Sequence, residues 1–152
     1  MTRAILDRIN IGRVLITSGT LIYSFVGVMD IVLIHRGIWY WPPYYRFHGV
    51  WLISLSGAIV TFTLYLLWWP VRNRIERVRI AGFISLLAVA SHLLAVFSGP
   101  FYGGSFYPWA KFEKGVLVPE GLFVNILVEM QIFAAILILI GMVLTIRLKS
   151  SS

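Results

Sequence analysis

Residues 122–146 read LFVNILVEMQIFAAILILIGMVLTI, and Glu129 is the one charged side chain in these 25 residues. A helix needs about 20 mostly apolar residues to cross the hydrocarbon core of a bilayer, so this stretch is long enough to span one. Three further apolar runs precede it, at about 14–34, 49–69 and 80–97. Because lipid offers exposed backbone groups no hydrogen-bond partner, each run is expected to be a helix. The sequence predicts an all-α, integral membrane four-helix bundle in a single transmembrane domain, residues 1–152.

The composition supports a membrane protein and excludes several functions. Hydrophobic residues make up 59% of the chain and charged residues 12%, a balance that is unusual for soluble proteins. The net charge of +7 comes from basic residues next to the apolar runs, so we expect lipid and other membrane subunits as partners, and no nucleic acid. The chain has no cysteine, which excludes disulfides, iron–sulfur clusters, c-type haem and thiol catalysis.

The distribution of basic residues predicts how the chain is oriented. Nine of its 13 Lys and Arg residues lie in the N-terminal arm, the turn at 72–79 and the C-terminal tail. The other four lie in the 36–47 and 98–120 loops. Because cytoplasmic loops carry the excess of basic residues, we expect a multi-pass protein of the cell membrane with both termini in the cytoplasm. The two loops then face outward.

Both outward loops are rich in aromatic residues. The 36–47 and 98–120 loops contain six aromatic side chains each. Aromatic residues gather at membrane–water interfaces, so a simple interfacial belt is one interpretation. Paired prolines and paired glycines in these loops favour fixed turns, which supports the other interpretation, an ordered cap over the helix ends or against a partner subunit. An ordered cap predicts that Trp41 and Trp109 are mostly buried.

Five ionisable residues fall in or beside the predicted spans, all toward the outward side. Ionisable side chains cost free energy in a bilayer and are therefore candidates for function. Asp30, His92 and Glu129 lie within predicted helices, and His35 and His48 flank the first outward loop. At about 1.5 Å per residue, four of them fall within a slab about 12 Å deep. We expect at least two of the five to share a site, and the first three to face the bundle interior or a subunit interface.

This residue set suits several cofactors, which the spacing alone does not separate. Imidazole and carboxylate groups bind copper, iron or zinc, so His35, His48 and Asp30 are candidate metal ligands. His48 and His92 lie on neighbouring antiparallel runs and are candidate ligands for haem b. Together with Asp30 or Glu129, a histidine could equally handle protons in a quinone pocket or a proton relay.

The same residues also have purely structural interpretations. Asp30 could pair with an arginine or a hydroxyl group across helices, and His92 could be hydrogen-bonded within the bundle. Glu129 could be a neutral acid bonded to Asn125 or Gln131. These interpretations predict independent polar groups with no shared ligand.

One part of the pattern resembles the ligand pattern in the C subunit of copper membrane monooxygenases, the methane and ammonia oxidisers. That pattern is an acid, three residues, a histidine, twelve residues and a second histidine. Here twelve residues separate His35 from His48, and Asp30 precedes them. The resemblance implies a copper site on the outward side. The sequence departs from it because four residues separate Asp30 from His35, which turns their side chains about 140° apart on a helix.

No catalytic motif identifies an enzyme, so the expected function rests on size and composition. We expect an integral subunit of a larger membrane-embedded assembly, of respiratory or other redox type, with a metal, haem or quinone site in the outer leaflet. A copper membrane monooxygenase-type subunit and a small membrane cytochrome are alternatives. A proton-coupled small transporter is another, although no inverted repeat and no helix interrupted at mid-depth supports it.

Overall fold

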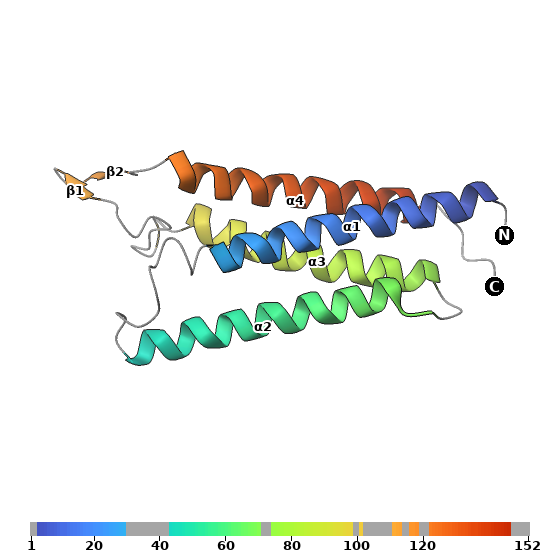
Figure 1. The fold of residues 1–152 in the computed structure, drawn as a ribbon. Helices are drawn as coiled ribbons and strands as arrows, with labels where there is room; N and C mark the ends of the chain where they lie inside the picture. Colours follow the sequence, from blue (N-terminus) through green and yellow to red (C-terminus); the bar gives the residue numbers. More distant parts are fainter. Residues whose placement is uncertain are drawn as a thin grey trace.

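The computed structural model contains an elongated helical bundle (Figure 1). It describes residues 3–29, 43–70, 74–98, 101, 111–113, 116–118 and 122–146. Across these described ranges there are four α-helices, namely α1 (Arg3–Met29), α2 (Pro43–Trp68), α3 (Arg74–Ser98) and α4 (Leu122–Ile146). Each is long and apolar enough to cross a membrane. The prediction of four such helices is confirmed.

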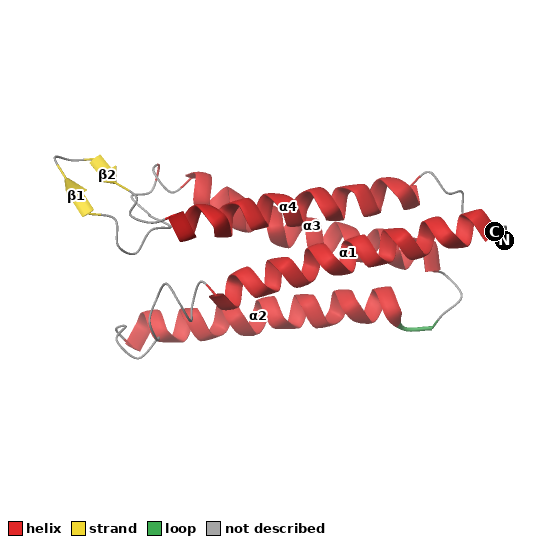
Figure 2. Cartoon of the chain, turned by 45° about the horizontal axis from the view of Figure 1, so that its top comes forward, coloured by secondary structure: helices red, strands yellow, loops and turns green. Residues whose placement is uncertain are grey.

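The helices alternate in direction along the chain, so the bundle has two distinct ends (Figure 1). At the first, which we call the terminal end, α1 and α3 begin and α2 and α4 end. The opposite end, which we call the hairpin end, carries two short antiparallel strands, β1 (Lys111–Glu113) and β2 (Val116–Val118) (Figure 2). This hairpin was not predicted from the sequence, because strands of three residues are too short to show a clear alternation of apolar and polar residues. Trp41 and Trp109, expected to be buried, lie outside the described residues.

Three helices begin earlier than the apolar runs predict. α1 begins at Arg3 instead of about residue 14, and α2 and α3 begin at Pro43 and Arg74, each six residues before its run. α4 has the predicted bounds, and residues 30–34 of the first run lie outside the described part of the chain.

The early start of α1 has a simple cause. In its first turns Ile9 is fully buried, whereas Asp7, Arg8 and Asn10 are exposed. The segment is therefore amphipathic, and it is held in the helix by one apolar stripe packed on the bundle. A search for uninterrupted apolar sequence misses such a segment because its mean hydropathy is lowered by the exposed residues.

α1 and α4 pack most closely, through small residues spaced seven apart. A Cβ atom added at Gly12 would lie 2.9 Å from the Gly141 carbonyl oxygen, and one at Gly19 would lie 2.7 Å from that of Ala134. Real Cβ atoms are not found so near a backbone oxygen, so both positions need glycine. Small residues at such positions let two helix backbones approach, which is the usual packing of helices in membranes.

The α4 face that meets α1 and α3 follows a heptad pattern. Its buried residues are spaced alternately four and three apart, namely Leu127, Gln131, Ala134, Ile138, Gly141 and Thr145. This spacing is typical of a seam between nearly parallel or antiparallel helices. One short polar contact ties α3 to α1, where the Thr20 and Ser85 hydroxyl oxygens lie 2.7 Å apart. Thr20 donates to the Ile16 carbonyl, so Ser85 is the donor to Thr20.

Candidate functional site

The structure describes two of the five ionisable residues in full. His92 lies on α3 and is half-buried, with its Nε2 atom shielded from solvent. Glu129 lies on α4 and is exposed. For His48 only the helical backbone of α2 is described, and Asp30 and His35 lie outside the described residues. The expectation of a shared site for these five therefore stays a prediction.

Gln131, which the sequence suggested only as a hydrogen-bond partner of Glu129, lies on the buried face of α4. Its side chain is fully buried, and neither its Oε1 nor its Nε2 atom has a hydrogen-bond partner. A buried amide without partners costs about 1–3 kcal/mol, so such a group calls for a functional or structural reason. The heptad spacing of α4 was the signal that places Gln131, and not Glu129, on the core face.

Three polar side chains approach one level of the bundle toward the hairpin end. Gln131 lies between Leu127, which clusters with Val26 of α1, and Ala134, which contacts Gly19. That register puts Gln131 level with Tyr23 of α1, which borders the same apolar cluster as Ala134.

The contact between α1 and α3 extends this level to a third helix. The Thr20–Ser85 bond places Ser85 of α3 level with Thr20 of α1. His92 follows Ser85 by two helical turns, so it lies within about one turn of Gln131 along the bundle axis. We call Tyr23, His92 and Gln131 the polar layer. It offers an imidazole, a phenol and an amide, so it can both donate hydrogen bonds to a polar group and accept them.

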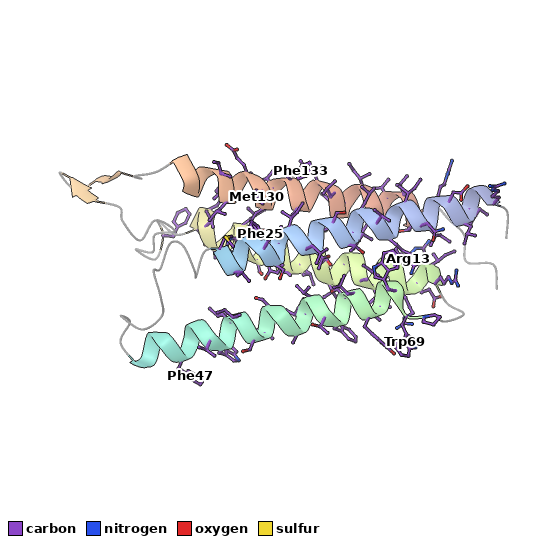
Figure 3. The ribbon with its side chains drawn as sticks, viewed as in Figure 1. Arg13, Phe25, Phe47, Trp69, Met130 and Phe133 are labelled. Carbon is purple, nitrogen blue, oxygen red and sulfur yellow. The ribbon has the colours of Figure 1, made fainter. Side chains whose placement is uncertain are left out.

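Glu129 belongs to a different surface of the same helix. Residues two apart on a helix point about 200° apart, so Glu129 faces outward while Gln131 faces the core. Among the described side chains of α4, the surrounding exposed stripe is otherwise apolar and contains Phe133, Ile136, Ile140 and Val143. Phe133, one turn from Glu129, points away from the bundle (Figure 3). The pairing of Glu129 with Gln131 that the sequence allowed is therefore ruled out.

The described residues bear on only part of the metal and haem predictions. Among them there is no group of three His, Cys, Asp or Glu side chains that could hold a metal ion. Leu67 of α2 and Val78 of α3 belong to one cluster. Because the two helices are antiparallel, His92, fourteen residues after Val78, lies level with Ile53 of α2. His48 lies five residues closer to the hairpin end, about 7.5 Å along the axis. A haem b held by these two histidines would have to bridge that offset.

Comparison with known proteins adds no assignment. No family model matches the chain, and no curated protein or solved structure matches it. The polar layer and the exposed stripe of α4 around Glu129 are therefore the features that bear on function.

Proposed function

We propose that this protein is an integral membrane subunit of a larger membrane-embedded complex, and that it binds a neighbouring subunit through the exposed stripe of α4. The observation that carries the proposal is the exposed carboxyl group of Glu129 on an otherwise apolar helix surface. Four helices of sufficient length and apolarity support the membrane location. The modest size of the chain and the aromatic-rich loops at 36–47 and 98–120 favour a redox or respiratory assembly as this complex.

A bilayer makes this position of Glu129 costly unless something covers it. Glu129 lies seven residues after the start of α4 at Leu122, about 10 Å along the helix. An acidic side chain facing acyl chains costs free energy, up to about 3 kcal/mol at the centre of a span. A polar group of a second subunit, docked against Glu129 and Phe133, removes that cost and buries the apolar stripe at the same time.

Co-purification tests this proposal. The tagged chain, extracted in a gentle detergent, is expected to retain a membrane partner, and Glu129→Gln is expected to lower the recovered partner at least roughly tenfold. Glu76→Gln is the matched control, because Glu76 is an exposed acid in the first turn of α3 at the opposite end. If the wild-type chain purifies alone, or if both variants retain the partner equally, the proposed interface is wrong.

Crosslinking locates the interface independently of charge. A photoreactive amino acid at Phe133, which is 53% exposed on the Glu129 stripe, is expected to capture the partner. The same group at Phe62, 51% exposed on α2, is expected to capture only lipid or detergent. Capture at Phe62 and not at Phe133 would move the interface to α2.

We also propose that both termini lie in the cytoplasm. The nine-to-four distribution of basic residues supports this orientation. The chain contains no cysteine, so single cysteines can be introduced without background. An impermeant thiol reagent added to intact cells is expected to label Lys114→Cys and to spare Arg74→Cys, and the reverse pattern would invert the topology.

A second candidate function is binding of a redox cofactor at the polar layer. The fully buried, unpartnered amide of Gln131 favours it, because an amide can donate to or accept from a quinone carbonyl or hydroxyl group. An absorption spectrum, quinone extraction and elemental analysis of the purified complex test for haem, quinone and copper. His92→Ala and Gln131→Leu are expected to lose the bound group, and a preparation with none of the three would reject this candidate.

A further inference from the structure

A small pocket lies at the terminal end, far along the bundle from the polar layer. It has a volume of about 80 Å³ and is bounded by the end of α2, the start of α3 and one turn of α1. Its charged lining residues are Arg13, Arg74 and Arg77, and Trp68, Trp69 and Pro70 form part of its wall. None of the described residues that line it is acidic. The pocket therefore concentrates positive charge with no counter-charge in its wall.

Arg13 is held in place at this pocket by contacts with Leu67 and Trp68 of α2. Its Nε–H donates to the Leu67 carbonyl oxygen at 2.7 Å, and its guanidinium lies over the Trp68 ring at 4.3 Å from the centroid. Trp68 is itself fixed, because its indole N–H donates to the Thr17 hydroxyl at 2.9 Å. Figure 3 shows Arg13 reaching from α1 toward the end of α2 near Trp69. The side chain is therefore ordered before any ligand binds.

The contacts of Arg13 leave most of its donors available. A guanidinium group has five N–H donors. One of them bonds Leu67 and a second makes a long 3.4 Å contact with the Asn10 side chain, so three remain for a ligand. Arg77 is also oriented, because its guanidinium lies 5.0 Å from the centroid of the Tyr65 ring. Each guanidinium group can bind phosphate oxygens through a fork of two N–H donors, so two preorganised arginines at one pocket favour a phosphate ligand.

Arg74 adds a third positive charge and a helix terminus. It is the first residue of α3 and is exposed. The positive charges of Arg74 and Arg13 repel each other, a cost that an anion between them would remove. The unpaired N–H groups in the first turn of α3 further favour a negative group at this place.

We propose that this pocket binds a phosphate group, and that its three arginines hold the negatively charged oxygens. The volume has room for a phosphate group. The pocket lies where the apolar segment Gly49–Trp68 ends, beside two tryptophans. Lipid phosphates and tryptophans occupy the same interfacial depth of a bilayer, so a negatively charged phospholipid can present its phosphate there.

Lipid binding to the purified full-length chain tests this inference. Native mass spectrometry is expected to show bound phosphatidylglycerol in preference to phosphatidylcholine, because the positive choline group beside the phosphate of phosphatidylcholine is repelled by the three arginines. Arg74→Gln and Arg77→Gln are each expected to weaken phosphatidylglycerol binding by roughly tenfold, since each removes hydrogen bonds to a charged group. Arg8→Gln is the matched control, because Arg8 is an exposed arginine of α1 outside the pocket. It is expected to leave binding within twofold of the wild type.

A second arm distinguishes lipid phosphate from soluble phosphate. If millimolar inorganic phosphate displaces phosphatidylglycerol in the wild type and not in Arg74→Gln, the pocket binds phosphate and accepts a soluble source. If inorganic phosphate does not compete, a lipid is the source. Equal binding of both lipids, or an equal loss in Arg8→Gln and Arg74→Gln, would overturn the proposal. Because Arg74 is exposed, its replacement leaves the packed bundle intact, and an unchanged melting temperature verifies this.

Discussion

The α1–α4 pair and the hairpin-end half of α2 represent opposite kinds of packing in one bundle. Where α1 meets α4, Gly12 and Gly19 approach the opposing backbone so closely that no side chain fits. In α2, none of the residues from 50 to 59 is buried, and a Cβ atom added at Gly57 would meet nothing within 4 Å. One interface is filled to backbone contact, and the other surface is open in the isolated chain.

This difference shows which part of the bundle is fixed by its own sequence. Close backbone approach gives many van der Waals contacts per residue, and such contacts hold helices together when both sides face lipid. The α1–α4 pair, with α3 packed against it, therefore forms the stable part of the fold. α2 is anchored mainly at the terminal end, where Leu67 joins a cluster with Ile9, Ile16 and Val78.

The largest expected effect comes from filling the close interface. In Gly141→Ala, the new Cβ would lie 2.8 Å from the Gly12 carbonyl oxygen, so the helices must separate. We expect a loss of about 1–3 kcal/mol in the free energy of unfolding. Gly57→Ala is the matched control and should gain about 0.5–1 kcal/mol, because alanine favours a helix where space is open. Thermal unfolding in detergent measures both, and equal effects would break the comparison.

Replacing the buried amide of Gln131 is expected to stabilise the fixed part of the bundle. Gln131→Leu removes a polar group that has no partner and keeps a side chain of similar size, so we expect a gain of about 1–2 kcal/mol. Thr63→Val tests the same change on α2, since the Thr63 hydroxyl is also fully buried without a partner. A destabilised Gln131→Leu variant would mean that the amide is bonded in the native protein, by a cofactor, water or another chain.

The four helices could be predicted from the sequence because bilayer thickness fixes the length of an apolar run. Their starts were less predictable, since only Ile5 and Ile9, spaced one turn apart among exposed polar residues, hold the first turns of α1 on the bundle. The buried face of α4 could be read from the sequence in principle, because the small residues Ala134 and Gly141 share one heptad stripe with the polar residues Gln131 and Thr145. The exposure of Glu129 follows from the same pattern.

The close approaches between helices were outside the reach of a single sequence. Glycines occur at 12, 19, 27, 57 and 141 alike, but Gly27 and Gly57 meet nothing within 4 Å. Small residues indicate that a close contact is possible, and the partner that makes it depends on how the helices are arranged. For the same reason the pocket around Arg13 was missed, because its wall comes from three helices.

A smaller effect is expected from the hydrogen bond between α1 and α3. Thr20→Val removes the acceptor of the 2.7 Å bond from Ser85, while the shape of the side chain is kept. We expect a loss of about 1 kcal/mol, near the usual value for one buried hydrogen bond. A double-mutant cycle with Ser85→Ala isolates the pair, and a coupling energy of zero would show that the bond does not stabilise the bundle.

The smallest effect is expected where α1 meets the open half of α2. The Tyr23 and Ser56 hydroxyl oxygens lie 3.4 Å apart, which is long for a hydrogen bond between hydroxyl groups, and both residues are only partly buried. Tyr23→Phe keeps the ring in the polar layer and removes only this contact, so the free energy of unfolding should change by less than about 0.5 kcal/mol. Thr20→Val, one turn away on the same helix, is the reference for a short contact. If Tyr23→Phe costs as much as Thr20→Val, α2 is held to α1 as firmly as α3 is, and its open half belongs to the fixed part of the bundle.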